Sequence, residues 1–177
     1  SFAIRPRYHV RLMLMMSIFV TAGEILTSAS RETRLREMAG NAQRQILRDI
    51  RRASDVVVVS DYKNPSVVRN YGSCVLITDQ EEDTGNSVTK AYYLHFPEGE
   101  NLGGLYFDRD TDSSEPDPES DELLCDGILD FEGRWNTNGA IRVGLIADTL
   151  PAKYMRESRG EGSRLQLVSS AVHRELR

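Results

Sequence analysis

Four acidic residues near the middle of the chain have the spacing and chemistry of metal ligands. They are Asp108, Asp110, Asp112 and Glu115. Calcium is bound by roughly six to eight oxygens, often supplied by one loop. An EF-hand starting at the first of these residues requires Gly at its sixth position and Glu at its twelfth. Ser113 takes the sixth position, Glu119 takes the twelfth, and no helices flank the segment. The alternatives are therefore a calcium site of another kind and a solvated acidic loop, and the polar composition of residues 108–122 favours the loop.

The other residues able to catalyse a reaction form no motif. His9, His95 and His173 lie in three separate regions without the spacing of a zinc site or a catalytic triad. The glycines in residues 99–104 lack the strand-to-helix context of a phosphate-binding loop and fit a turn better. The sequence therefore predicts a protein without enzymatic activity and without a cofactor, calcium being the one open possibility.

The two cysteines, Cys74 and Cys125, are far apart and follow no CxxC or metal-ligand spacing. In an exported domain they can pair as one disulfide, whereas in a reducing compartment they are expected to be buried thiols. We predict the disulfide.

The elements that position these residues differ sharply in charge. Residues 1–52 hold ten arginines and four acidic residues, a net charge of +6, so the remainder carries −11 of the total of −5. A basic arm on an acidic body argues against a nucleic-acid-binding protein. It favours subunits that pack head to stem, or an arm that faces anionic lipid. A solvated basic helix without a partner is the alternative.

Residues 12–29 form an apolar run of 18 residues with Glu24 as its one charge, at the lower length limit of a membrane-spanning helix. Arg5, Arg7 and Arg11 precede it, which predicts a cytoplasmic N-terminus and a single pass through the inner membrane. A cleaved signal peptide is the alternative. The run leads straight into residues 30–54, which have helical periodicity and no proline, so one helix over 12–54 is favoured.

The amphipathic segment 30–54 carries one apolar stripe. Because Ile46, Leu47 and Ile50 lie nearest the following domain, we expect them to contact it. The outer members of the stripe are expected to bind a partner subunit; they are Leu35, Met38 and Ala42.

The sequence pattern of residues 55–177 is typical of strands and turns. Alternating or β-branched runs predict strands over 55–60, 73–78, 88–96, 102–108, 123–132 and 140–147, with a short last strand from 165–168 and 171–172. Turn residues separate these runs, among them the glycine-containing segments 97–101 and 136–139. The predicted fold class is α+β, with a long N-terminal helix packed on an antiparallel sheet. The predicted regions are a basic and apolar segment over 1–29, an amphipathic helix over 30–54 and a β-rich head over 55–177.

This order of features resembles the type IV pilin superfamily, and within it the minor pseudopilins of type II secretion, most nearly the J-type subunit. The resemblance lies first in the apolar segment that contains Ala22 and Gly23 and in the arginine-rich helix that follows it, especially residues 45–53. It lies also in two strand-forming segments, residues 123–131 and 141–145. The chain departs from the family at the processing site. Tyr8, His9 and Met13 stand where the family has Gly, Phe and Glu.

The resemblance implies a non-enzymatic subunit of a secretion pseudopilus or pilus-like fibre. Such a subunit is held in the inner membrane, has a periplasmic or extracellular head, and assembles with other pilin-like subunits. The alternative is a membrane-anchored extracytoplasmic module that binds a ligand or senses one.

Overall fold

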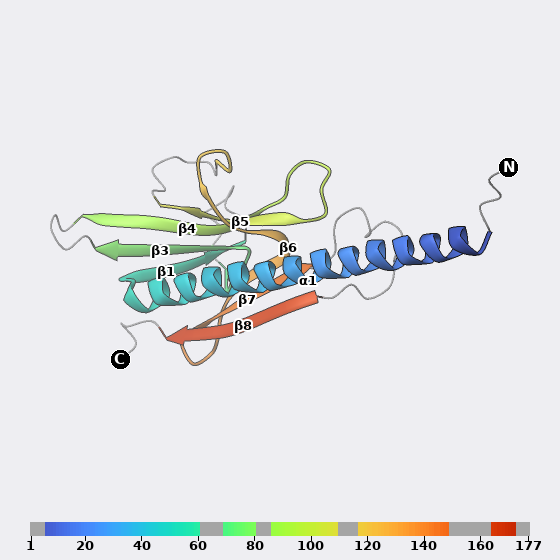
Figure 1. Cartoon of the computed structure of the whole chain (residues 1–177). Helices are drawn as coiled ribbons and strands as arrows, with labels where there is room; N and C mark the ends of the chain where they lie inside the picture. Colours follow the sequence, from blue (N-terminus) through green and yellow to red (C-terminus); the bar gives the residue numbers. More distant parts are fainter. Residues whose placement is uncertain (1–5, 61–68, 81–85, 110–116, 149–163, 173–177) are drawn as a thin grey trace. The chain divides into compact units, whose positions relative to one another are not determined.

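A computed structural model describes residues 6–60, 69–80, 86–109, 117–148 and 164–172 (Figure 1). The chain divides into two compact units, Ser1–Arg34 and Leu35–Arg177. Helix α1 spans Pro6–Arg52 and contributes to both. Each unit is described by itself below.

Helix α1 is long because nothing within it breaks it. Its one proline, Pro6, occupies the first position, where no intrahelical N–H bond is lost. The hydroxyls of Thr21 and Thr27 donate back to the carbonyls four residues earlier, so these polar groups are satisfied within the helix. Arg51 and Arg52 lie in the last turn, where cations favour the negative end of the helix dipole.

The head contains one antiparallel sheet, as the sequence predicts. Its strands are β1 (Asp55–Val59), β2 (Tyr71–Gly72), β3 (Cys74–Gln80), β4 (Ser87–His95), β5 (Gly103–Asp108), β6 (Glu122–Trp135), β7 (Ala140–Asp148) and β8 (Arg164–Val172). They lie in the order β1-β3-β4-β5-β6-β7-β8, and β2 pairs with β6 off this path. The α+β class is thereby confirmed, with the helix packed on a curled sheet.

The curl of the sheet depends on β6, which has 14 residues and changes partner along its length. Its early residues pair with β5, while its later residues pair with β7 on one side and with β2 on the other. Register shifts interrupt both long ladders, and such irregularities bend a strand. The end of β6 therefore approaches β1 and β3, which are not its neighbours in the strand order.

Alternation along the strands places apolar side chains on both faces of the sheet. The larger cluster lies between the sheet and α1 and includes Ile46, Ile50, Ile77, Tyr92 and Phe131. A smaller cluster contains Val59, Cys74, Ala91 and Tyr93. Cys74 and its neighbour Val75 belong to different clusters, so the smaller one lies on the face away from the helix.

The turns between strands follow the predicted glycines. Gly99 has a φ of 78° in the connection from β4 to β5, where the N–H of Glu100 donates to the carbonyl of Pro97. Gly139 has a φ of 76° in the β6 to β7 turn, where its N–H donates to the carbonyl of Asn136. Both positions need the left-handed backbone that glycine adopts without steric cost.

The structure corrects two lengths and adds one strand. The last strand is continuous over Arg164–Val172, where the sequence predicted a short strand from 165–168 and 171–172, and β6 extends beyond the predicted range 123–132 at both ends. The two-residue strand β2 had no signal in the sequence. Within the described part of the chain, no helix is long and apolar enough to cross a membrane.

Candidate functional site

In the first unit, the large apolar side chains of α1 are exposed among the described residues. We call residues 13–26 the apolar arm. Its large apolar side chains are 62–75% exposed; they are Met13, Met15, Met16, Ile18, Phe19, Val20, Ile25 and Leu26. Consecutive residues of a helix point in different directions, so these side chains are not confined to one face. Exposed apolar surface of this kind marks contact with another protein or with lipid.

Two of the three predicted partner contacts on the amphipathic segment are buried within the head. Leu35 and Ala42 are only 5% and 3% exposed and belong to the main core, while Met38 packs partly buried against the same cluster. The sheet reaches farther along α1 than the sequence indicates, so it covers the outer part of the stripe as well as Ile46 and Ile50. Among the described residues of α1, the large apolar side chains that remain exposed are therefore those of the apolar arm.

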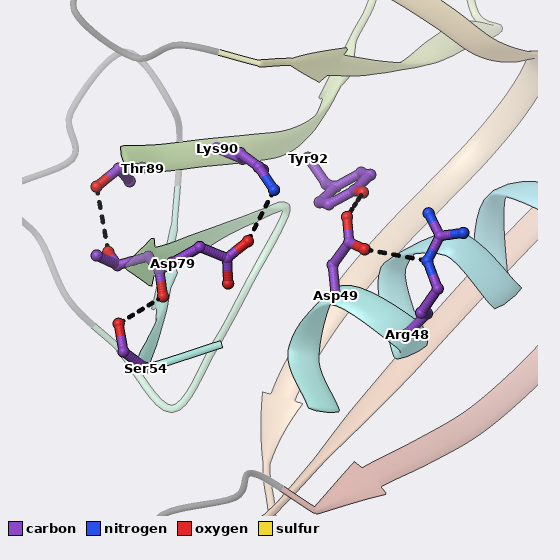
Figure 2. Close-up of polar contacts among 8 residues, drawn as sticks. Arg48, Asp49, Ser54, Asp79, Thr89, Lys90 and Tyr92 are labelled. Atoms are coloured by element: carbon purple, nitrogen blue, oxygen red, sulfur yellow. Dashed lines mark hydrogen bonds and ion pairs between the residues drawn. The ribbon is translucent and has the colours of Figure 1, made fainter. Parts of the chain in front are cut away.

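The end of α1 is joined to the sheet by a partly buried polar pair (Figure 2). The Tyr92 hydroxyl donates to Asp49 Oδ2 at 2.6 Å, and Arg48 Nε lies 3.3 Å from Asp49 Oδ1. Burial, helped by the neighbouring carboxylate, raises the pKa of the Tyr92 hydroxyl far above its ordinary value. The hydroxyl therefore stays protonated and acts as a permanent donor, a structural role.

A second set of polar contacts lies between the turn after α1 and strands β3 and β4 (Figure 2). Ser54 Oγ donates to the Thr78 carbonyl at 2.8 Å, the hydroxyls of Thr78 and Thr89 lie 3.1 Å apart, and Lys90 Nζ lies 2.7 Å from Asp79 Oδ2. A nucleophile needs a general base within hydrogen-bond reach. Ser54 instead bonds a backbone carbonyl, so these contacts hold the elements together and do not form a catalytic site.

The structure describes only one member of the predicted calcium set. Asp108 is the last residue of β5 and is buried, not exposed on a loop. Asp110, Asp112 and Glu115 lie outside the described residues. Among the residues that are described, no three His, Cys, Asp or Glu side chains are grouped so as to hold a metal ion. The calcium site therefore stays a prediction.

The predicted disulfide between Cys74 and Cys125 is absent. Both residues are buried thiols, and they belong to the clusters on opposite faces of the sheet. Their strands, β3 and β6, are separated by β4 and β5 in the strand order. A disulfide needs Cα atoms within about 7 Å, whereas Cys125 lies in the early part of β6, which pairs with β5 and not with the strands near Cys74. Burial, together with the nearby Asp126 carboxylate, raises the pKa of the Cys125 thiol to about 12.

We expect both thiols to resist a maleimide reagent in the native protein, with or without a reductant. Cys125 should resist even at a pH of about 10, because the thiolate is the reactive form. In guanidinium chloride without a reductant, both should react fully, as counted by mass spectrometry. If labelling of the unfolded protein requires prior reduction, a disulfide joins the two cysteines.

The sequence had no signal for the contact between Asp49 and Tyr92, which are 43 residues apart. The apolar pattern of the sequence did identify the apolar arm, which is the strongest candidate functional surface among the described residues. Comparison of the chain with models of protein families, with curated proteins and with solved structures gives no match.

Proposed function

We propose that the chain is a non-enzymatic structural subunit of a type II secretion pseudopilus or a type IV pilus-like fibre. The observation that supports this is the apolar arm, whose large side chains are exposed along one continuous helix that also belongs to a separately packed head. A helix that is apolar on all sides must be covered by lipid or by other helices. Packing of such helices against one another in a fibre covers this apolar surface.

The proposed location is the inner membrane, with residues 12–29 as the single pass and the head on the periplasmic or extracellular side. Support comes from the near absence of charge in this run and from the arginines before it. The proposed partners are other pilin-like subunits. Their helices cover the arm, since the head buries Leu35 and Ala42 within its own core.

The test uses the full-length chain and the variant Phe19→Asp. A charged residue in the centre of a bilayer costs about 3 kcal/mol, so the variant should partition into membranes or detergent micelles roughly a hundredfold less than the wild type. The matched control is Leu123→Asp, which changes an exposed apolar residue of the head and should leave partitioning unchanged.

Assembly is tested by placing a photo-crosslinking amino acid at position 19 in cells. The expected adducts are proteins with an apolar N-terminal helix, and the same amino acid at position 123 should give none of them. Full-length protein that stays monomeric in water, or an arm that crosslinks only to lipid, would contradict the assembly proposal.

A second candidate function is an extracytoplasmic module that binds a small ligand. One observation favours it, a hollow of about 190 Å³ on β6, β7 and β8, whose lining includes Asp130, Glu132, Arg134 and Arg142. Side chains of both charges can orient a polar molecule. A monomeric head that retains a small molecule during purification would support this function over assembly.

A further inference from the structure

Strand β8 is the outermost strand of the sheet and lacks the usual protection of an edge. Figure 1 shows β8 beside β7 at the border of the sheet. The strand has nine residues and pairs with β7 through nine consecutive positions without a register shift. Natural edge strands are blocked by charged residues, proline, bulges or short length. In β8, Arg164 is the one charged residue, and the strand contains no proline. Among the described residues, no backbone group pairs with its outer side.

The opposite edge of the sheet, β1, is covered. The Arg69 N–H donates to the Val58 carbonyl at 3.0 Å, and Gly72 packs directly against the Val59 carbonyl. Among the described residues, backbone groups thus cover part of one edge, whereas the outward donors and acceptors of β8 have no backbone partner. A row of such groups fits one kind of occupant, an extended polypeptide segment.

The hollow on β6, β7 and β8 adds a recognition element beside this edge. Arg134 and Arg142 lie opposite each other on β6 and β7, and Arg142 lies opposite Ser170 of β8. Arg134 is engaged by Glu132 and by the ring of Tyr71, 5.6 Å from its guanidinium. Within the described residues, Arg142 has no ion-pair partner.

The floor of the hollow is open at Gly144. An added Cβ there would meet no atom closer than 3.9 Å. The hollow is also bordered by Gln166 and Val168 of β8, so a side chain from a strand beside β8 can reach across the edge strand into it. The side-chain group that pairs best with the Arg142 guanidinium is a carboxylate.

We propose that the β8 edge binds an extended segment of a partner protein by strand addition, and that an acidic side chain of this segment pairs with Arg142. Backbone hydrogen bonds supply the affinity, and the charge pair supplies the selectivity. This surface shares no residue with the apolar arm, so the proposal does not depend on membrane insertion or on assembly through the helix.

The probe is a fluorescent nonapeptide of alternating threonine and valine with a central glutamate, measured by fluorescence anisotropy with the full-length protein. It should bind about fivefold more tightly than the same peptide with a central lysine, as expected for an exposed ion pair. Arg142→Gln should remove this preference. Arg44→Gln, on an exposed part of α1, should preserve it.

The strand geometry is tested with two N-methylated forms of the glutamate peptide, one methylated at its odd positions and the other at its even positions. Only one edge of an added strand faces β8, so one form should lose binding and the other should retain it. Phe19→Asp should bind the probe normally, which separates this proposal from the proposed function of the arm.

Three results would overturn the proposal. Equal binding of both methylated peptides would show that backbone pairing is not involved. A preference for glutamate that survives Arg142→Gln would place the contact elsewhere. Absence of peptide binding, including absence caused by a dimer of the protein itself, would exclude an extended partner segment at this edge.

Discussion

Replacement of Gly72 by alanine is expected to lower the free energy of unfolding by roughly 3 kcal/mol, the upper range for overpacking a rigid site. A Cβ at this position would lie 1.9 Å from the Val59 carbonyl oxygen and 2.9 Å from the Ser60 Cα atom. Both atoms belong to the backbone, so no rotamer change relieves the clash. Gly72 does not have a positive φ, and the effect is therefore steric and not conformational.

The matched control is Gly144→Ala, which also places a methyl group on a strand of the same sheet. Its nearest neighbour would be the Glu132 carbonyl oxygen at 3.9 Å, an ordinary van der Waals contact. We expect the control to change stability by less than about 0.5 kcal/mol. Chemical denaturation followed by circular dichroism measures both. Equal stability of the two variants would show that β1 and β2 do not approach as closely as described.

Replacement of Leu35 by aspartate is expected to destabilise the head by roughly 3 to 5 kcal/mol, nearly as much as Ile46→Asp, because each places an unpaired charge in the core. Both residues belong to the main apolar cluster. The sequence alone predicted that only Ile46→Asp would unfold the head and that changes at Leu35 and Met38 would affect assembly instead.

Asn41→Asp is the control for the aspartate series. Asn41 is exposed on the same helix, and its side-chain oxygen already accepts a hydrogen bond from Arg44 Nη2 at 2.5 Å, which a carboxylate can also accept. Its thermal midpoint should match that of the wild type. A Leu35→Asp variant as stable as this control would restore Leu35 as a partner contact and would place the start of the core farther along α1.

The local patterns of the chain predicted most of the elements. The 3.6-residue period and the lack of proline predicted the helix, and its observed end at Arg52 is two residues from the predicted one. Alternation of apolar residues located all the strands except β2, and the glycines at 99 and 139 marked the two tight connections. Each of these features depends on neighbouring residues, so the sequence contains the necessary information.

The candidate sites were predicted less well, because they depend on which segments meet. The apolar stripe showed that one face of the helix must be covered, but it did not show whether the sheet or a partner covers Leu35. Cys74 and Cys125 were both predicted to lie in strands, yet their pairing depends on the strand order and on the face to which each side chain points.

By itself, the sequence determined the α+β class, the helix and its apolar arm, and the opposite net charges of residues 1–52 and 53–177. The tertiary structure alone decided that Leu35 and Ala42 belong to the core, that the cysteines lie on opposite faces, that Tyr92 meets Asp49, and that β8 is an edge strand of the sheet. The physical reason is that periodicity records which side chains avoid water, whereas the element that covers them follows from the curl and order of the whole sheet.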